Sequence, residues 1–338
     1  MTLTLLPIDE QVMVVTGASS GIGLVTAKHA AKLGARVMLA SRNGGDLATA
    51  VDEIRQAGGR AAYVVADVAD PRQVERIADE TVSQFGRIDT WVNNAAVSMY
   101  GRVVDLSLDD MRRQMDVNYW GQVYGSRAAV QRMETQGGAL INVGSVLSDR
   151  AIPLQANYCA AKHALKAFTD ALRMELEEQG IPISVTLVKP ASIDTPFFDK
   201  AKTLMGTEPQ PVPPVYAPEV VAEVIVQAAQ RPIREVIAGG AGAMASAARF
   251  TPRLADLYME RNLFENQSTG EPAYNRRDNL YTPVPYDGGE RGRNWRGHTR
   301  ESSLYTKMML HPVAAAAVFG ACAIAVSVAL GRAGHVGR

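Results

Sequence analysis

Short, mostly apolar runs alternate with helix-patterned segments along the first 240 residues, and this alternation limits the chain to few folds. Apolar runs bounded by turn residues are typical of strands that are covered by helices on both faces. We expect these strands at residues 12–15, 37–40, 62–65, 90–93, 139–143, 183–188 and 235–237.

The intervening segments carry helix signals at their ends. Asp70 and Pro71 give a capping side chain followed by proline at the first helical position, and Gly34 is a typical C-terminal stop. We expect helices at residues 21–33, 46–57, 71–85, 157–179 and 218–230, and a further helix that opens at Ser107. This order predicts an α/β fold with a doubly wound, Rossmann-type, seven-stranded parallel sheet, whose ligands bind at the carboxyl ends of the strands.

The character of the chain changes after Gly240. We divide it into a Rossmann-type catalytic domain at 1–240, a C-terminal extension at 241–305 and a hydrophobic tail at 306–338. Residues 243–264 have a helical pattern that Pro252 interrupts. Residues 266–303 are polar and rich in Arg, Asn and Gly, so we expect a mostly irregular, partly disordered segment.

Residues 313–330 carry no charge, and as a helix at ~1.5 Å per residue they would extend about 27 Å, near the hydrocarbon thickness of a bilayer. Their high alanine content makes a membrane span marginal. Three interpretations stay open: a transmembrane anchor, an amphipathic or subunit-contact helix, and a frayed tail.

Charge and cysteine content exclude several classes of protein. The 35 basic side chains balance the 35 acidic ones, so the sequence has no basic footprint that would indicate nucleic-acid binding. With only two cysteines we expect no disulfide framework and no metal site, and a reducing compartment fits best. The N-terminus has no secretory signal pattern. We therefore predict a cytoplasmic protein whose membrane association, if any, is through the tail.

A glycine-rich turn at residues 16–23 connects the first expected strand to the first helix. Gly17 permits a tight turn, while Gly21 and Gly23 let the helix start pack near the sheet with its amide groups facing a ligand. A helix N-terminus carries partial positive charge and free N–H donors, which suit a pyrophosphate. We predict a dinucleotide here rather than an empty turn. The residues that we assign to it are Gly17, Ser19, Ser20, Gly21, Ile22 and Gly23.

The spacing of these glycines, G-x-x-x-G-x-G, resembles the loop of the short-chain dehydrogenase/reductase family, and the resemblance continues to about residue 240. It implies contacts of Asp67 and Val68 with the adenine ring. Asn93 and Ala95, in an Asn-Asn-Ala-Ala run, correspond to the family's Asn-Asn-Ala-Gly and would tie neighbouring strands and line the cofactor floor. After the sixth strand, Pro190, Ile193 and Thr195 resemble the segment that contacts the nicotinamide carboxamide.

The end of the second strand bears on the choice of cofactor. An NAD site usually has a carboxylate here for the ribose 2′-hydroxyl, but residues 40–43 contain no acid. Ser41 and Arg42 suit a 2′-phosphate instead, because the guanidinium of Arg42 is a planar cationic donor. We predict NADP(H) rather than NAD(H).

Tyr158 and Lys162 are four residues apart in an expected helix, so both side chains lie on one face. A free phenol titrates near ~10, and a nearby ammonium would lower that pKa. Tyr158 would then exchange a proton with the substrate oxygen during hydride transfer. The resemblance implies that Lys162 also bonds the nicotinamide ribose. It implies that Ser145 holds the substrate carbonyl and that Asn118 supports a proton-relay water.

Taken singly, each of these four residues has an ordinary structural explanation, but their order behind a matching glycine loop favours an enzyme. The apolar residues that the resemblance brings near the pocket indicate a hydrophobic ketone, aldehyde or alcohol: Val97, Met99, Leu147, Ile152, Leu154, Phe197 and Phe198. Residues 200–216, with four prolines, are interpreted as a lid.

A catalytically silent nucleotide-binding regulatory protein and an isomerase or dehydratase of the same fold are the alternative functions. Family members often form dimers or tetramers, so we expect a homodimer or homotetramer.

Overall fold

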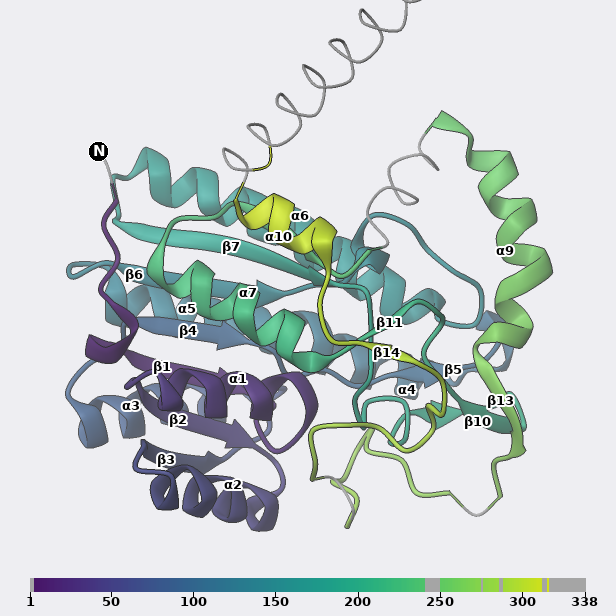
Figure 1. Ribbon diagram of the computed structural model, residues 1–338, viewed down its shortest axis with the longest axis horizontal. Coiled ribbons are helices and arrows are strands. Elements are labelled where there is room, and N and C mark those ends of the chain that lie inside the picture. The colour runs from purple at the N-terminus through teal and green to yellow at the C-terminus, as the bar shows by residue number, and fades with distance from the viewer. Residues whose placement is uncertain (1–2, 241–249, 275, 286–287, 312–314, 316–338) are drawn as a thin grey trace, which may run out of the picture.

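The computed structural model describes residues 3–240, 250–274, 276–285, 288–311 and 315. A parallel sheet of seven strands forms its centre, which confirms the predicted fold class (Figure 1). In spatial order, the strands are β12 (Glu235–Ala238), β7 (Ile183–Pro190), β6 (Gly138–Val143), β4 (Thr90–Asn93), β1 (Val12–Thr16), β2 (Arg36–Ser41) and β3 (Arg60–Val65).

Helices cover both faces of this sheet, as the apolar character of the strands requires. In β1, Met13 and Val15 belong to one hydrophobic core and Val14 to the other, because successive side chains of a strand point to opposite faces. One core is covered by α1 (Gly21–Lys32), α2 (Gly44–Gln56) and α7 (Pro218–Gln230). The other is covered by α3 (Pro71–Phe85), α5 (Gly121–Met133) and α6 (Ala156–Glu178).

The helix that was expected to open at Ser107 is more complex than its sequence suggested. The Ser107 side chain accepts a hydrogen bond from the Asp110 amide, and α4 (Leu108–Met115) begins there. A π-helical turn, Asp116–Trp120, then joins α4 to α5 without a break. Such turns insert one extra residue into a helix and often occur at functional sites.

The strand order reverses between β1 and β4. From β1 the chain proceeds outward through β2 and β3, and then returns to place β4, β6, β7 and β12 on the other side. In doubly wound sheets, this switch point opens a crevice at the carboxyl ends of the strands. The glycine-rich turn lies at this end, directly after β1.

The lid predicted at residues 200–216 is held in three small sheets. In one, β9 (Lys202–Thr203) pairs with β5 (Met99–Tyr100). In the second, β10 (Thr207–Pro209) pairs with β13 (Ser268–Pro272) of the extension. In the third, β11 (Val215–Tyr216) lies between β8 (Ser192–Ile193) and β14 (Thr299–Arg300). The lid is therefore connected to both the domain and the extension.

The C-terminal extension packs against the catalytic domain. Its helix α9 (Pro252–Asn266) begins at Pro252, which agrees with the predicted interruption; residues 241–249 lie outside the described part. Between β13 and α10 (Leu304–Leu310) the chain has little regular structure, yet Leu280 and Val284 are buried. Backbone hydrogen bonds and ion pairs attach the described residues of 266–303 to the domain, and the partial disorder of this segment stays a prediction.

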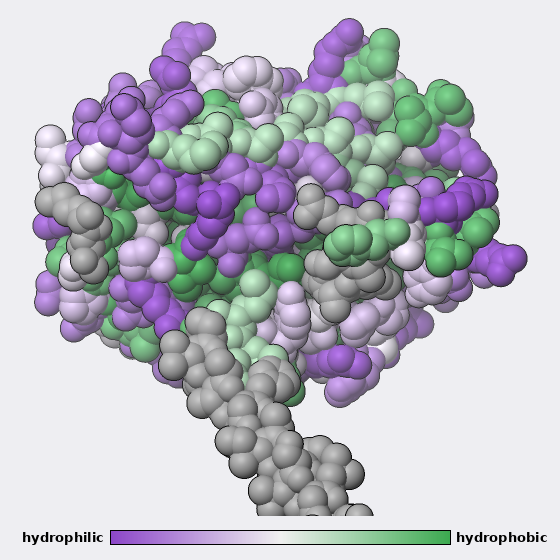
Figure 2. Space-filling view, turned by 90° about the horizontal axis from the view of Figure 1, so that it is seen from above, coloured by the Kyte–Doolittle hydropathy of each residue, from purple (hydrophilic) through white to green (hydrophobic). Residues whose placement is uncertain are grey.

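A search of the described residues finds no helix long and apolar enough to cross a bilayer. The tail segment 313–330, in which a span was predicted, lies outside the described residues except for Ala315. On the face seen from above, hydrophilic and hydrophobic residues are interspersed (Figure 2).

Candidate active site

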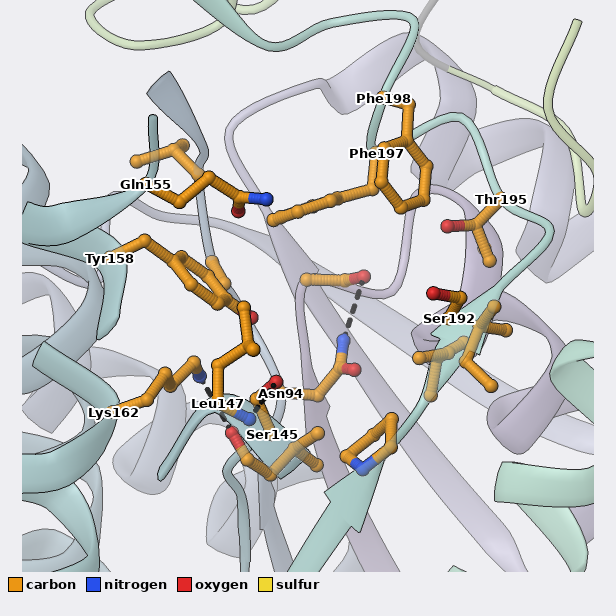
Figure 3. Close-up of a pocket in the computed structure, with 18 of the residues that line it drawn as sticks. Asn94, Ser145, Leu147, Gln155, Tyr158, Lys162, Ser192, Thr195, Phe197 and Phe198 are labelled. Carbon is orange, nitrogen blue, oxygen red and sulfur yellow. Dashed lines mark hydrogen bonds between the residues drawn. The ribbon is translucent and has the colours of Figure 1, made fainter. Parts of the chain in front are cut away.

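One cavity of about 420 Å³ lies at the carboxyl ends of the central strands (Figure 3). The glycine-rich turn, the ends of β2, β3, β4, β6 and β7, the start of α6, the lid and the extension all contribute to its wall. Most of the residues predicted from the sequence as cofactor contacts line it: Gly17, Ser19, Ser20, Gly21, Ile22, Ser41, Arg42, Asp67, Val68, Ala95, Pro190, Ile193 and Thr195.

The glycine-rich turn is shaped by two close approaches of backbone to backbone. Gly17 has a φ of +68°, which L side chains rarely adopt, and its amide donates to the Ala40 carbonyl at 2.7 Å. Gly23 lies beneath the turn, where a Cβ atom would be only 2.3 Å from the Gly17 carbonyl oxygen. A larger residue at either position would displace the turn, so both glycines keep the start of α1 against the cavity.

The extension contacts this turn, and no motif in the sequence predicts that contact. The Gly289 carbonyl accepts a hydrogen bond from the Gly21 amide at 2.9 Å, at the N-terminus of α1. Nearby, Glu290 forms an ion pair with Lys28 at 2.7 Å, and the lid residue Lys200 donates to the Ser20 hydroxyl at 2.7 Å. The Gly21 amide was predicted to face a ligand, but here it bonds to the chain itself.

The predicted 2′-phosphate end of the cavity is also bordered by the extension. The Arg42 guanidinium donates to the backbone carbonyls of Asn279, Leu280 (3.3 Å) and Tyr281 (3.1 Å). These hydrogen bonds hold the Arg42 guanidinium in the cavity wall.

Asp67 also lines the cavity and has a second, structural role. Its carboxylate forms an ion pair with Arg113 at 2.5 Å, and the Arg113 side chain also donates to the Leu280 carbonyl at 3.1 Å. Asp67 and its neighbour Val68 both line the cavity, as the resemblance implied. Their proposed contact with an adenine ring stays a prediction.

Asn93 was predicted both to tie strands together and to line the cofactor floor, and only the first is found. Its buried amide accepts from the Trp91 indole at 2.7 Å and donates to Ser126 and Asn142. The next residue, Asn94, lines the cavity instead and donates to the Thr16 carbonyl at 2.9 Å. Since successive strand residues point to opposite faces, Asn93 points into the core while Asn94 borders the glycine turn.

Ser145, Tyr158 and Lys162 are brought together as predicted, and all three line the cavity. The α6 register puts Tyr158 and Lys162 on one face, with the Lys162 amine 5.7 Å from the centre of the Tyr158 ring. The amine donates to the Val143 carbonyl at 2.7 Å. The Ser145 hydroxyl, just after β6, accepts from the Leu147 amide at 3.0 Å. Figure 3 shows Tyr158 and Lys162 on one wall, with Thr195 and Ser192 on the other.

The expected direction of the Tyr158 pKa is contradicted. Burial raises the pKa of the Tyr158 hydroxyl well above its usual range, and the hydrogen bond with Ser145 opposes this only in part. Burial also lowers the pKa of the Lys162 amine to about 7. Burial thus shifts both groups toward their neutral forms, because desolvation penalises the charged form of each. The spacing in the sequence predicts that the Lys162 ammonium lies near the Tyr158 phenol. It does not show how deeply the two side chains are buried, so their desolvation could not be predicted.

Asn118 lies in the π-helical turn, and its side chain is completely buried. Its Oδ1 accepts from the Val97 amide at 2.8 Å, and its Nδ2 donates to the Val97 carbonyl at 2.9 Å. The amide thereby fixes the segment after β4, and it is absent from the residues found to line the cavity. Its predicted role in a proton relay stays a prediction.

The other half of the cavity is mostly apolar. Of the residues expected there, Val97, Leu147, Ile152, Phe197 and Phe198 line it, whereas Met99 and Leu154 are not among the lining residues. Val212, Pro213 and Pro214 of the predicted lid line it too, whereas sequence reasoning missed Met259 and Leu263 of α9. It also missed Gln155, which lies three residues before Tyr158. The helical pattern of α9 could not reveal which surface the helix would cover.

These residues fit a nicotinamide dinucleotide along one half of the cavity. The glycine turn lines one end of the cavity, and the Arg42 guanidinium lies at the other end. Between them, Pro190, Ile193 and Thr195 border the region in front of Tyr158. A carbonyl held between Ser145 and Tyr158 would lie within reach of a proton donor, which suits acid–base chemistry on a C=O or CH–OH group.

Comparison with known proteins gives consistent similarities. The sequence profile described as short chain dehydrogenase matches residues 11–205. The chain is 44% identical over 324 residues to an uncharacterized oxidoreductase, YxnA, of Bacillus subtilis, covering 94% of this chain and 90% of that protein. It is 35% identical over 200 residues to a 3beta-hydroxysteroid dehydrogenase of Mediterraneibacter gnavus, covering 59% of this chain and 72% of that protein.

A solved structure is similar as well. A short-chain type dehydrogenase/reductase from Mycobacterium marinum superposes with a TM-score of 0.60 at 26% sequence identity. The alignment covers 70% of this chain and 97% of the other, so the likeness includes nearly all of that protein.

Proposed function

The chain belongs to the short-chain dehydrogenase family and is an NAD(P)-dependent oxidoreductase; we propose that it uses NADP(H) to interconvert a hydrophobic ketone or aldehyde and its alcohol. One observation carries this proposal. Ser145, Tyr158 and Lys162 meet in a single cavity whose other half has the features of a dinucleotide site. We assign Tyr158 as the general acid and base.

The residues of the protein position the substrate carbonyl and transfer one proton to or from its oxygen. The bound nicotinamide supplies or accepts the hydride. The Ser145 hydroxyl holds the substrate oxygen, and the neutral Tyr158 phenol donates its proton to that oxygen in the reducing direction. Lys162 lies beside the phenol, and its amine, with a pKa near 7, is able to gain a proton or lose one. The raised pKa of Tyr158 favours the protonated form that carbonyl reduction needs.

The preference for NADP(H) rests on the cationic end of the cavity. Ser41 and Arg42 line it, and hydrogen bonds to the Leu280 and Tyr281 carbonyls hold the Arg42 guanidinium there. A 2′-phosphate would accept charge-assisted hydrogen bonds from this guanidinium. NAD(H) lacks that phosphate and would form no such hydrogen bonds.

A hydrophobic substrate is supported by the aromatic and aliphatic lining beyond Tyr158. Phe197 lies with its ring centre 5.9 Å from that of Tyr158, and Met259 and Leu263 of α9 add to the same wall. The relative named as a 3beta-hydroxysteroid dehydrogenase fits an apolar, alicyclic substrate class.

The decisive experiment is a screen for NADPH oxidation against ketones and aldehydes of increasing apolar size. We expect turnover with apolar ketones, and none in the Tyr158→Phe variant even though that variant still binds NADPH. Turnover without net NADPH consumption would favour an isomerase or dehydratase. Tight NADPH binding with no conversion of any substrate would favour a regulatory protein.

We keep three further predictions about assembly and location. The chain forms a homodimer or homotetramer, its catalytic domain is cytoplasmic, and residues 313–330 attach it to a membrane. Light scattering of the purified protein tests the first. Deleting the residues after His311 tests the last: the truncated protein should lose any dependence on detergent and keep NADPH binding.

A further inference from the structure

The apolar half of the cavity contains one buried amide, that of Gln155. This residue precedes α6, and its side chain is 6% exposed. Three residues before Tyr158 in the sequence, it lies on the same side of the helix start. Figure 3 shows its amide extending over Tyr158 toward Phe197, across the space that a substrate would enter.

A second glutamine, from the extension, fixes the orientation of this amide. Gln267 is 0% exposed, and its Nε2 donates to the Leu263 carbonyl at 2.7 Å and to the Pro153 carbonyl at 3.1 Å. Both hydrogens of that nitrogen are therefore used, and the Gln267 Oε1 must act as an acceptor. Gln155 consequently donates to it through Nε2, at 2.7 Å. The hydrogen-bond pattern leaves no freedom to exchange the nitrogen and oxygen of Gln155.

This arrangement leaves the Gln155 Oε1 at the cavity as an acceptor that receives no hydrogen bond from the part of the chain that the structure describes. Phe197, Phe198 and Leu263, which line the same region, offer no donor. A donor on a bound molecule would satisfy this oxygen.

We propose that Gln155 determines substrate specificity by accepting a hydrogen bond from a hydroxyl group of the substrate, at a position away from the reacting carbonyl. The substrate class is then a hydrophobic ketone or aldehyde that carries a hydroxyl. Gln267 is a positioning residue that acts through Gln155, so the extension takes part in substrate choice. This inference rests on the proposed carbonyl chemistry.

A matched set of ketones tests it. The probes are hydroxydecalones with the hydroxyl at successive ring positions, each compared with the methyldecalone substituted at the same carbon. For at least one pair, the protein should favour the hydroxyl-bearing member by about tenfold in kcat/KM, as expected when the Gln155 acceptor gains or lacks its donor. Gln155→Met, which keeps the side-chain length but removes the acceptor, should abolish this preference, measured as the ratio of kcat/KM between the two members of the pair.

Two further variants separate specificity from structure. Gln267→Leu should reduce the preference while kcat for the methyldecalone is retained, because the Gln155 amide loses its fixed orientation. Gln210→Leu is the control, since Gln210 also lines the cavity and donates to the extension at the Ser268 carbonyl, but is only half-buried. It should keep the preference. If Gln155→Met fails to fold, as judged by thermal unfolding and NADPH binding, Gln155→Leu replaces it.

The outcomes are distinct. Turnover of both members of every pair at equal efficiency, an unchanged preference in the Gln155 variant, or loss of preference in the Gln210 control would each overturn the specificity role while leaving the enzyme assignment intact. No NADPH oxidation with any probe or with the wider ketone screen would overturn the proposed function itself.

Discussion

The two halves of the cavity wall are built by different kinds of structure. The glycine turn, Ser145 and Tyr158 follow directly from strands and helices of the central sheet. The wall at Asn279 comes from a chain segment with little regular structure. Packed side chains hold the first kind, whereas hydrogen bonds and ion pairs attach the second to the domain. Chemistry is therefore assigned to the rigid half, while enclosure and selectivity fall to the other half.

The largest effect is expected for a variant of Tyr158. It tests whether the proton transfer depends on the sheet-derived half of the cavity wall. Tyr158→Phe removes the proton donor and should lower kcat by about a thousandfold, within the range attributed to general acid–base groups. NADPH affinity, measured by fluorescence titration, should change little. Retention of more than a tenth of wild-type turnover would remove Tyr158 from its assigned role.

The next prediction concerns the free energy of unfolding, which burial of the Lys162 amine in the sheet-derived half should lower. The pKa of Lys162 falls to about 7 in the folded protein, so the unfolded chain binds more protons between that pH and the usual lysine value. Stability should then rise with pH through this window. Lys162→Met removes the buried amine and should stabilise the protein by roughly 2–4 kcal/mol at neutral pH, less at alkaline pH. Denaturant unfolding of both proteins at several pH values measures this, and a constant difference would contradict it.

Arg42→Asp tests the boundary between the two halves, because this side chain from β2 bonds to the extension. Loss of charge-assisted hydrogen bonds to a 2′-phosphate should weaken NADPH binding by about 10- to 100-fold, with a much smaller change for NADH. Arg72→Asp, the same charge change at an exposed position of α3, is the matched control. Equal losses for both cofactors would show that Arg42 acts on structure and not on the phosphate.

The smallest effect is expected in the irregular half. Gly289 has a φ of +102°, so Gly289→Ala introduces backbone strain and should lower the free energy of unfolding by about 1 kcal/mol. Because the Gly289 carbonyl bonds to the Gly21 amide, hydrogen exchange at Gly21 should become faster. Gly58→Ala, at a positive φ with no atom near the added Cβ, provides a comparison outside the cavity. Faster exchange at Gly21 in that variant too would argue against a direct link.

The difference between regular elements and irregular segments also explains which parts of the fold and of the candidate site could be predicted from the sequence. Apolar periodicity marks the seven strands, and the spacing of Tyr158 and Lys162 predicts their common face, because regular elements repeat their geometry. The contacts of Arg42 with three successive carbonyls leave no such trace, since every residue has a carbonyl. The raised pKa of Tyr158 depends on burial by segments far away in the chain. Asn93 and Asn94 could be distinguished only once the strand register was known.

The hydrogen bond between Gly21 and Gly289 also bears on how the protein is made. During synthesis the N-terminal region leaves the ribosome first and generally folds first. The sheet, with its glycine turn and Tyr158, can therefore assemble before the segment that closes over it exists. A nascent chain would present an open nucleotide groove, and synthesis of the extension would convert that groove into an enclosed chamber.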